Sequence, residues 1–209
     1  MLMEDFATAS DWEKFNSSLL IEVTRSTGVF TCSGIAVSGQ LVITAAHCLE
    51  GDVKKVRVFT QESYNPAYPS LEVESFKIHQ NYNPQNSPFV SDLAKIKMKK
   101  NFLPFIKLYP IYTGTSFDSP LYRFGFGARN KKNLRTVITP KFKTFDHVQH
   151  IIELNDMFSR SGDSGGPIYI QNGKDIFVLA IHSTFSHGPE GNFSYNPLLA
   201  PYLPWIYEN

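Results

Sequence analysis

Three short motifs, far apart along the chain, carry a histidine, an aspartate and a serine in that order. They are Leu41-Val-Ile-Thr-Ala-Ala-His-Cys48, Ser91-Asp-Leu-Ala-Lys-Ile-Lys-Met98 and Arg160-Ser-Gly-Asp-Ser-Gly-Gly-Pro167. The third motif alone would be explained equally well by a glycine-rich turn. The three together, in this chain order, fit the residues that nucleophilic acyl transfer requires. The strongest constraint on the fold is therefore that it has to bring these three motifs together at one place.

Each of these residues has a chemical reason to be present. A serine hydroxyl is a weak nucleophile near neutral pH, so a base has to accept its proton during attack. We assign Ser164 as the nucleophile, His47 as the general base and then acid, and Asp92 as the carboxylate that orients the imidazole. The developing oxyanion needs preorganised N–H donors, and loss of one typically costs about 2.7–4 kcal/mol. Because glycines flank Ser164, we expect the backbone N–H groups of Gly162 and Ser164 to form the oxyanion hole.

These motifs resemble those of the chymotrypsin/trypsin-like serine peptidases. The match rests on Thr44-Ala-Ala-His-Cys48, Asp92-Leu-Ala-Lys-Ile-Lys97 and Gly162-Asp-Ser-Gly-Gly-Pro167. Weaker similarity is present at Lys77-Ile-His-Gln-Asn-Tyr-Asn83, Gly125-Phe-Gly127 and Tyr202-Leu-Pro-Trp-Ile206. The resemblance implies an all-β fold of two six-stranded antiparallel β-barrels, with the active site between them and a C-terminal helix.

The rest of the chain also favours β-structure. Short runs rich in Val, Ile, Phe and Tyr are separated by Gly, Pro, Asn and Ser, which is typical of an all-β barrel or sandwich. The predicted strands are 19–24, 31–37, 40–44, 53–60, 71–78, 92–98, 121–126, 134–139, 149–154, 168–171 and 176–182. Turn-forming residues gather between residues 109 and 119. We therefore expect one peptidase unit with an N-terminal barrel over 16–110, a C-terminal barrel over 115–196 and a helix over 197–209.

Charge and hydropathy exclude some classes of partner. The chain has 209 residues and a net charge of +1, which argues against a general polyanion-binding protein. Its most basic run consists of Lys95, Lys97, Lys99 and Lys100, whose alternation favours the solvated face of a strand over a nucleic-acid patch. No apolar run approaches the ~20 residues of a membrane span. We expect a monomer that acts on a protein or peptide substrate, with neither nucleic acid nor a membrane as partner.

The sequence leaves the compartment open. Residues 1–10 lack the basic start and apolar stretch of a signal peptide, which indicates a cytoplasmic protein if the sequence is complete and a secreted one if it is a mature form. In the family that the chain resembles, cysteines spaced like Cys32 and Cys48 form a disulfide that ties the His-bearing loop to the preceding strand. The resemblance implies this bridge for an exported protein, whereas two buried thiols are the alternative in a reducing compartment.

The resemblance also implies where the P1 side chain of a substrate, the one before the cleaved bond, binds. The implied pocket residues are Phe158, Ser159, Arg160, His182, Ser183, Thr184, Phe185 and Gly191. Phe158, rather than an aspartate, stands six positions before Ser164, so we do not expect cleavage after Lys or Arg, because the buried cation would lack a partner charge. His182 and Ser159 resemble the pocket of glutamyl endopeptidases and imply a preference for an acidic P1 residue. The alternative is a strand histidine whose hydrogen bonds a neighbour satisfies. Ser183 is expected to bind the triad carboxylate.

Asp163 raises the question of activation. In the chymotrypsin branch the equivalent carboxylate pairs with a freshly cut N-terminal amine, which orders the oxyanion hole. This chain has no Ile-Val-Gly-Gly start, yet a buried aspartate needs a partner. The candidates are Arg123, Arg160 and the amine of a new terminus near Phe6. Constitutive activity, N-terminal processing and activation by another protease or partner all stay open.

The leading interpretation is a serine endopeptidase that hydrolyses peptide bonds through an acyl-enzyme intermediate. A catalytically silent binding protein on the same scaffold is one alternative, although such proteins normally lose a triad residue and none is lost here. An esterase is another, but α/β-hydrolases order their triad Ser, acid, His. His79, which we expect on a surface strand, and His147, His150 and His187 lack the spacing of a metal site. We predict no metal and no organic cofactor.

Overall fold

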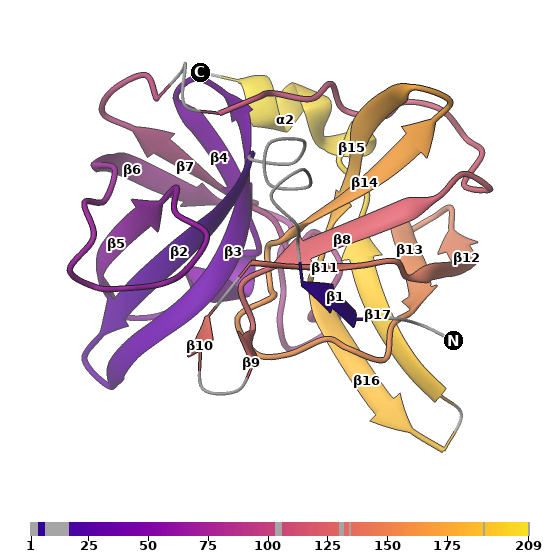
Figure 1. Cartoon of the computed structure of the whole chain (residues 1–209), viewed down its shortest axis with the longest axis horizontal. Coiled ribbons are helices and arrows are strands. Elements are labelled where there is room, and N and C mark those ends of the chain that lie inside the picture. Colours follow the sequence, from indigo (N-terminus) through magenta and orange to yellow (C-terminus); the bar gives the residue numbers. More distant parts are fainter. Residues whose placement is uncertain are drawn as a thin grey trace.

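A computed structural model describes residues 4–6, 17–102, 106–129, 132–133, 135–189 and 191–208. The strands gather into two assemblies that lie side by side, the first built from the earlier part of the chain and the second mainly from the later part (Figure 1). Residues 16 and 209, the outer ends of the predicted ranges, lie outside the described residues, and so does residue 134, the predicted start of a strand.

The first assembly is one antiparallel sheet of six strands in the order β5-β2-β3-β4-β7-β6. Its strands are β2 (Ser18–Arg25), β3 (Gly28–Ser38), β4 (Leu41–Thr44), β5 (Val53–Phe59), β6 (Val73–Ile78) and β7 (Ala94–Met98). A bridge between Val58 and Leu71 links the two edges of the sheet, so that it closes on itself. Fully buried side chains such as Ile35, Val42 and Ile96 fill the interior, each contributing about 1.5–3 kcal/mol by burial.

The second assembly contains a five-stranded sheet in the order β1-β11-β8-β14-β15 and a four-stranded sheet in the order β12-β13-β17-β16. The strands are β1 (Glu4–Phe6), β8 (Leu121–Gly125), β11 (Thr136–Ile138), β12 (Lys141–Asp146), β13 (Ile151–Asn155), β14 (Pro167–Asn172), β15 (Asp175–Ile181), β16 (Thr184–Gly188) and β17 (Gly191–Pro197), with a small hairpin of β9 (Ala128–Arg129) and β10 (Lys132–Asn133). Ile152, Ile168 and Leu179 share one buried cluster between the two sheets. A bridge from Ala180 to Leu198 connects them. The fold is of the predicted all-β, trypsin-like class.

All predicted strands occur, with ends shifted by at most about three residues, as is usual for strand boundaries. The sequence patterns missed β1, the short strands β9 and β10, and β12, β16 and β17. β16 and β17 contain Gly, Asn, Ser and His, which normally signal turns. They are strands because their backbones pair with each other and because β17 also pairs with β13. β12 is largely exposed and lies at the edge of its sheet.

The C-terminal helix is shorter than the predicted 197–209. Pro197 ends β17, and the helix α2 covers only Leu203–Tyr207 after the 3-10 turn η2 (Ala200–Tyr202). In the parts of the chain that the structure describes, no helix has the length and apolar character needed to cross a membrane.

The end of the chain is fastened to the first sheet. Lys95 Nζ donates hydrogen bonds of 2.9 Å to the carbonyl oxygens of Trp205 and Glu208. His79 lies edge-on to the rings of Tyr202 and Trp205, with centroids 5.1 and 4.8 Å away. His79 is therefore buried, not on the surface as the sequence suggested, and burial lowers its pKa.

Candidate active site

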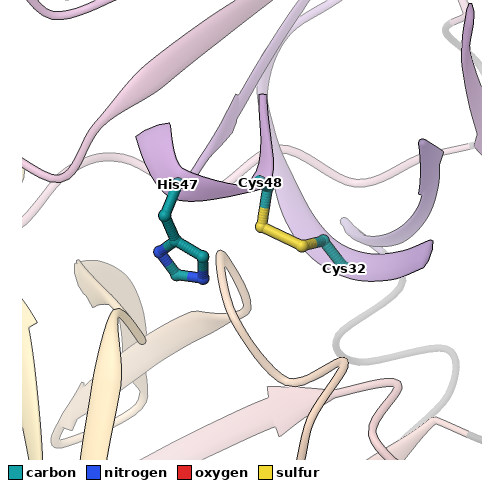
Figure 2. Close-up of side chains that lie close together, drawn as sticks. All are labelled: Cys32, His47 and Cys48. Carbon is teal, nitrogen blue, oxygen red and sulfur yellow. A yellow bond between two sulfur atoms is a disulfide. The ribbon is translucent and has the colours of Figure 1, made fainter. Parts of the chain in front are cut away.

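His47 lies on η1 (Ala46–Cys48), a single 3-10 turn that follows β4. Arg25 Nη2 donates hydrogen bonds of 3.1 Å to the carbonyl oxygens of His47 and Cys48. The predicted disulfide between Cys32 and Cys48 is present and ties the turn to β3 (Figure 2). Because both sulfurs are bonded to each other, neither offers the thiolate that a metal ion would need beside His47.

Asp92 is completely buried and bonds His47 twice. Its Oδ2 lies 2.8 Å from His47 Nδ1, and its Oδ1 accepts the backbone N–H of His47 at 2.9 Å. A carboxylate only accepts hydrogen bonds, so Nδ1 carries the proton and Nε2 is left as a proton acceptor. Ser183 Oγ donates to Asp92 Oδ2 at 2.5 Å, in the arrangement that the resemblance implied. Ser91, directly before Asp92, has φ of 53°, a left-handed conformation, and its hydroxyl lies 3.1 Å from that of Tyr202.

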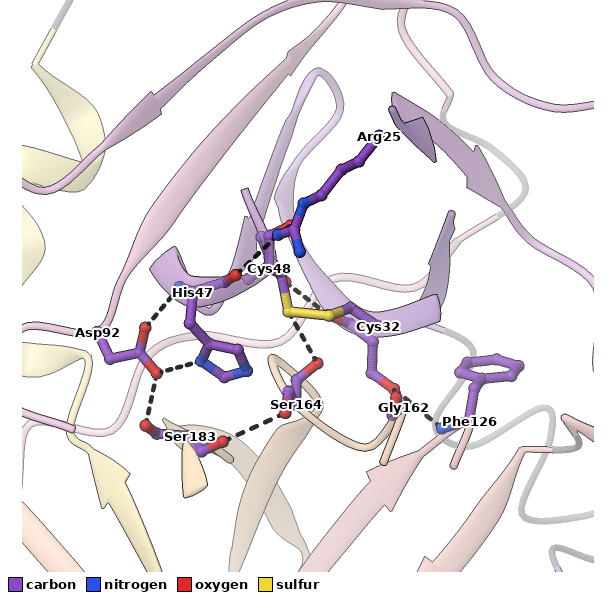
Figure 3. Close-up of a disulfide and its surroundings, with 11 residues drawn as sticks. Arg25, Cys32, His47, Cys48, Asp92, Phe126, Gly162, Ser164 and Ser183 are labelled. Carbon is purple, nitrogen blue, oxygen red and sulfur yellow. Dashed lines mark hydrogen bonds and ion pairs between the residues drawn. A yellow bond between two sulfur atoms is a disulfide. The ribbon is translucent and has the colours of Figure 1, made fainter. Parts of the chain in front are cut away.

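Ser164 lies on the loop between β13 and β14 and is partly exposed. Its carbonyl oxygen accepts the backbone N–H of Ser33 at 2.7 Å, which binds this loop to β3 of the first assembly. Its hydroxyl donates to the carbonyl oxygen of Ser183 at 3.3 Å, and Figure 3 shows Ser164 beside both His47 and Ser183.

The N–H groups of Gly162 and Ser164 are oriented by their own peptide units. In a trans peptide the C=O and N–H groups point in opposite directions. The carbonyl that precedes Gly162 accepts the N–H of Ala128 at 3.3 Å, and the one that precedes Ser164 accepts the N–H of Gly166 at 2.9 Å. Gly162 has φ of 102°, which favours glycine. Within the described residues neither N–H has a protein acceptor, so both are available to an oxyanion.

A buried guanidinium group contacts the loop that carries Gly162 and Ser164. Arg123 of β8 donates to Asp156 through Nε at 2.6 Å and through Nη2 at 3.1 Å. Its Nη1 lies 3.1 Å from Asp163 Oδ2, and all three side chains are fully buried. Burial disfavours the charged forms, but the ion pairs outweigh it. They hold the pKa of Asp156 below its usual value and raise that of Arg123.

These contacts answer the question of what pairs with Asp163. Arg123 provides the ion pair. Arg160 donates its backbone N–H to Asp163 Oδ2 at 2.9 Å, while its guanidinium donates to the carbonyl oxygen of the preceding residue. Gly127 donates its N–H to Asp163 Oδ1 at 2.7 Å. Phe6, where a new terminus was considered, belongs to β1 and pairs with β11.

The predicted pocket residues separate by burial. Ser159, His182 and Ser183 are buried, Phe158, Thr184, Phe185 and Gly191 are partly exposed, and Arg160 is exposed. Asp156 holds two of the predicted pocket residues in place. Its Oδ1 accepts a hydrogen bond from the N–H of Phe158 at 3.1 Å, and its Oδ2 accepts one from the hydroxyl of Ser159 at 2.9 Å. The hydroxyl proton of Ser159 is therefore already committed.

His182 is fully buried and uncharged. Its Nδ1 lies 3.1 Å from Asn196 Oδ1, and the amide of Asn196 is oriented by donating to three acceptors, including Ser194 Oγ. Nδ1 therefore carries the proton, and Nε2 presents a lone pair that has no partner among the described residues. Burial and the nearby charge of Arg123 lower the pKa of His182 to about 4. The ring is nearly parallel to that of Phe185, with centroids 6.3 Å apart.

Sequence reasoning missed Asp156, Ser33 and Asn196. Ser33 donates its hydroxyl to the carbonyl of Gly162 at 2.8 Å, and no local pattern distinguishes it from other strand serines. The sequence did contain a signal for the burial of Arg123, which was considered only as a candidate partner of Asp163. Its place two residues after the buried Leu121 in an alternating strand puts both side chains on one face.

Comparisons with known proteins agree with this geometry. The family model described as Trypsin matches residues 13–206. The chain is 26% identical, over 259 aligned positions, to phenoloxidase-activating factor 3 of Holotrichia diomphalia, with 100% of this chain and 74% of that protein covered. It is 36% identical over 69 positions to a trypsin of Sarcophaga bullata, covering 32% of this chain and 26% of the trypsin. It is 23% identical to CLIP domain-containing serine protease B4 of Anopheles gambiae, covering 94% of this chain and 67% of that protein. Since the family model spans almost the whole chain, the protein belongs to the trypsin family and is a serine-type endopeptidase.

Proposed function

We propose that this endopeptidase cleaves protein substrates through Ser164, His47 and Asp92 by way of an acyl-enzyme. The observation that carries the proposal is the convergence of three distant motifs in one hydrogen-bonded group, in which Ser183 contacts both Asp92 and Ser164. The two assemblies act as one unit in this proposal, with His47 and Asp92 on the first and the nucleophile on the second.

The proposed reaction has two similar halves. In the first, His47 Nε2 takes the proton of Ser164 Oγ while Oγ bonds to the carbonyl carbon of the substrate. Asp92 stabilises the imidazolium, which then gives the proton to the leaving amine as the C–N bond breaks. In the second half, water loses a proton to His47 and attacks the acyl carbon, and Ser164 leaves with that proton. The N–H groups of Gly162 and Ser164 stabilise the oxyanion in both halves.

Ser164→Ala tests this mechanism. We expect it to lower kcat on the order of 10⁶-fold and to abolish labelling by a serine-directed phosphonate. Ser186→Ala, which changes an exposed serine of β16, is the matched control and should be labelled like the wild type. A folded wild-type protein that takes up no phosphonate would instead support a silent binding protein. Hydrolysis of small esters without any peptide cleavage would support an esterase.

Preference for an acidic P1 residue is the narrower part of the proposal, and we propose that it depends on proton uptake. The hydroxyl of Ser159 already donates its hydrogen bond to Asp156, and neutral His182 offers only a lone pair at Nε2. Both groups repel a bare carboxylate. A glutamate side chain therefore binds together with a proton, either as the neutral acid or beside a protonated His182.

The corresponding experiment is a mass-spectrometric cleavage profile on a peptide library at pH 5.5 and 7.5. We expect cleavage after Glu, relative to Gln, to rise at the lower pH. His182→Ala should remove this pH dependence, while His187→Ala, an exposed histidine of β16, should keep it. A profile without preference for Glu or Asp at either pH would contradict the pocket assignment and leave the endopeptidase mechanism intact.

A further inference from the structure

A single buried guanidinium holds both ends of the loop that carries the oxyanion hole. Arg123 contacts Asp156 at the start of this loop and Asp163 next to the nucleophile. Asp156 in turn accepts the N–H of Phe158, and Asp163 accepts the N–H of Arg160. One cation inside the protein therefore links the two carboxylates that organise the segment from residue 156 to residue 163.

The environment of Asp163 is built by the strand that carries this cation. Arg123 is on β8, and Gly127 follows the same strand and donates its N–H to Asp163 Oδ1 at 2.7 Å. A Cβ atom at Gly125 would lie 2.3 Å from that oxygen, so only glycine leaves room for the carboxylate there. Both oxygens of Asp163 are thus engaged by groups that belong to the folded chain itself.

We propose that Arg123 is a positioning residue that keeps the oxyanion hole in its active shape in place of a newly cut N-terminal amine. The inference rests on the proposed function and selects constitutive activity from the three modes of activation that the sequence left open. Arg123 touches no reacting atom. It acts through Asp163, whose fixed backbone lets the flanking N–H groups of Gly162 and Ser164 face the substrate.

The two kinds of cation differ in how they respond to pH. An α-amine ordinarily loses its proton near pH 7.7–8.0, whereas a guanidinium keeps its charge above pH 12. An oxyanion hole that depends on an amine therefore collapses in mildly alkaline solution. One that depends on Arg123 persists.

The first test measures phosphonate labelling of Ser164 and kcat/KM for a peptide from pH 6 to 10.5, for the chain with a free N-terminus and with a blocked N-terminal extension. We expect both quantities to rise and then stay constant within about twofold up to pH 10.5, in both forms. A fall with a midpoint between about pH 8 and 9.5 that depends on the free amine would overturn the inference. So would activity that requires removal of the extension.

The second test compares two buried carboxylates, each paired with an arginine. Asp163→Asn should lower kcat about 100-fold while KM changes less than about threefold, because the loss falls on the oxyanion hole. Glu22→Gln is the matched control, since Glu22 is 2% exposed and pairs with Arg57 at 2.7 Å, on the outer part of the first sheet. It should lower Tm and leave kcat within about twofold. Arg123→Lys, which keeps the charge, should retain at least about tenfold more kcat than Arg123→Met, with active-site titration correcting for unfolded protein.

These outcomes separate the inference from the function on which it rests. A wild-type protein labelled at Ser164 only when its amine is free overturns the inference alone. Equal losses of kcat in Asp163→Asn and Glu22→Gln, proportional to the decrease in Tm of each variant, would show that Arg123 has only a structural role. This result would also overturn the inference. A wild-type protein unlabelled at every pH overturns both, because an ordered hole beside an intact triad has to react.

Discussion

The hydroxyl of Ser33 donates a hydrogen bond of 2.8 Å to the carbonyl oxygen of Gly162 and so joins a strand of the first assembly to the nucleophile loop of the second. The same hydroxyl accepts the N–H of Phe126 at 2.9 Å, and the backbone N–H of Ser33 donates to Ser164 at 2.7 Å. One residue of β3 thus fixes three points across the boundary on which the proposed catalysis depends.

Ser33→Ala should therefore affect both stability and turnover. The substitution removes one hydrogen bond from the buried carbonyl of Gly162 and one from the N–H of Phe126, which costs about 1–3 kcal/mol of unfolding free energy. We also expect kcat to fall about tenfold, because the peptide after Gly162 loses its anchor. Urea unfolding and steady-state kinetics measure the two effects. A stability loss with unchanged kcat would show that the oxyanion loop is held sufficiently by other contacts.

Asp92→Asn should lower kcat about 10⁴-fold with little change in KM. The amide can donate a hydrogen bond to His47 Nδ1 and thereby favour the tautomer that places the proton on Nε2, where it blocks proton transfer from the nucleophile. Ser183→Ala keeps the carboxylate and removes only its 2.5 Å hydrogen bond, so a loss of about tenfold is expected. Similar kinetics for both variants would contradict the orienting role of Asp92.

Reduction of the disulfide should destabilise the fold. The bridge joins cysteines separated by 16 residues, and in the chain-entropy model closing a loop of that size contributes about 3 kcal/mol. The double variant Cys32→Ala with Cys48→Ala should lower the free energy of unfolding by about this amount, which is measured as a lower urea midpoint. A reducing agent should have the same effect on the wild type. An unchanged midpoint in the double variant would mean that Arg25 and the surrounding core hold the histidine turn without the covalent link.

His182 should make the fold sensitive to acid. Its folded-state pKa is lowered to about 4, while an unfolded histidine titrates near 6.5, so the unfolded state binds the proton first. The stabilisation is complete above pH 6.5 and is lost as the pH falls toward 4, a change of about 3 kcal/mol. Urea unfolding at pH 7.5, 5.5 and 4 measures it. His182→Gln should flatten this part of the profile, and His187→Gln should not. Parallel profiles for all three proteins would contradict the assignment.

The sequence predicts what depends on local pattern. Runs rich in Val, Ile, Phe and Tyr between turn-forming residues located β2 to β7, and the glycine-flanked motif around Ser164 indicated a tight loop with free N–H donors. Asp156 could not be found in this way. Its surroundings, Leu154-Asn-Asp156-Met-Phe158, look like an ordinary turn, and its partner Arg123 lies on another strand, so only the folded sheet shows the pairing. Asn196 is similar, because a polar residue before a proline suggests a loop until its amide is seen to orient His182.

The hydrogen bond from Ser164 to the carbonyl of Ser183 has a kinetic consequence. In the proposed mechanism this contact has to break before Ser164 Oγ donates to His47, so each catalytic cycle would begin with the exchange of one hydrogen bond for another. A single such bond is worth about 0.5–1.5 kcal/mol, so this contact slows acylation by at most about tenfold. In the proposed mechanism, a substrate that binds displaces the hydroxyl of Ser164 from the carbonyl of Ser183, and the hydroxyl then donates to His47.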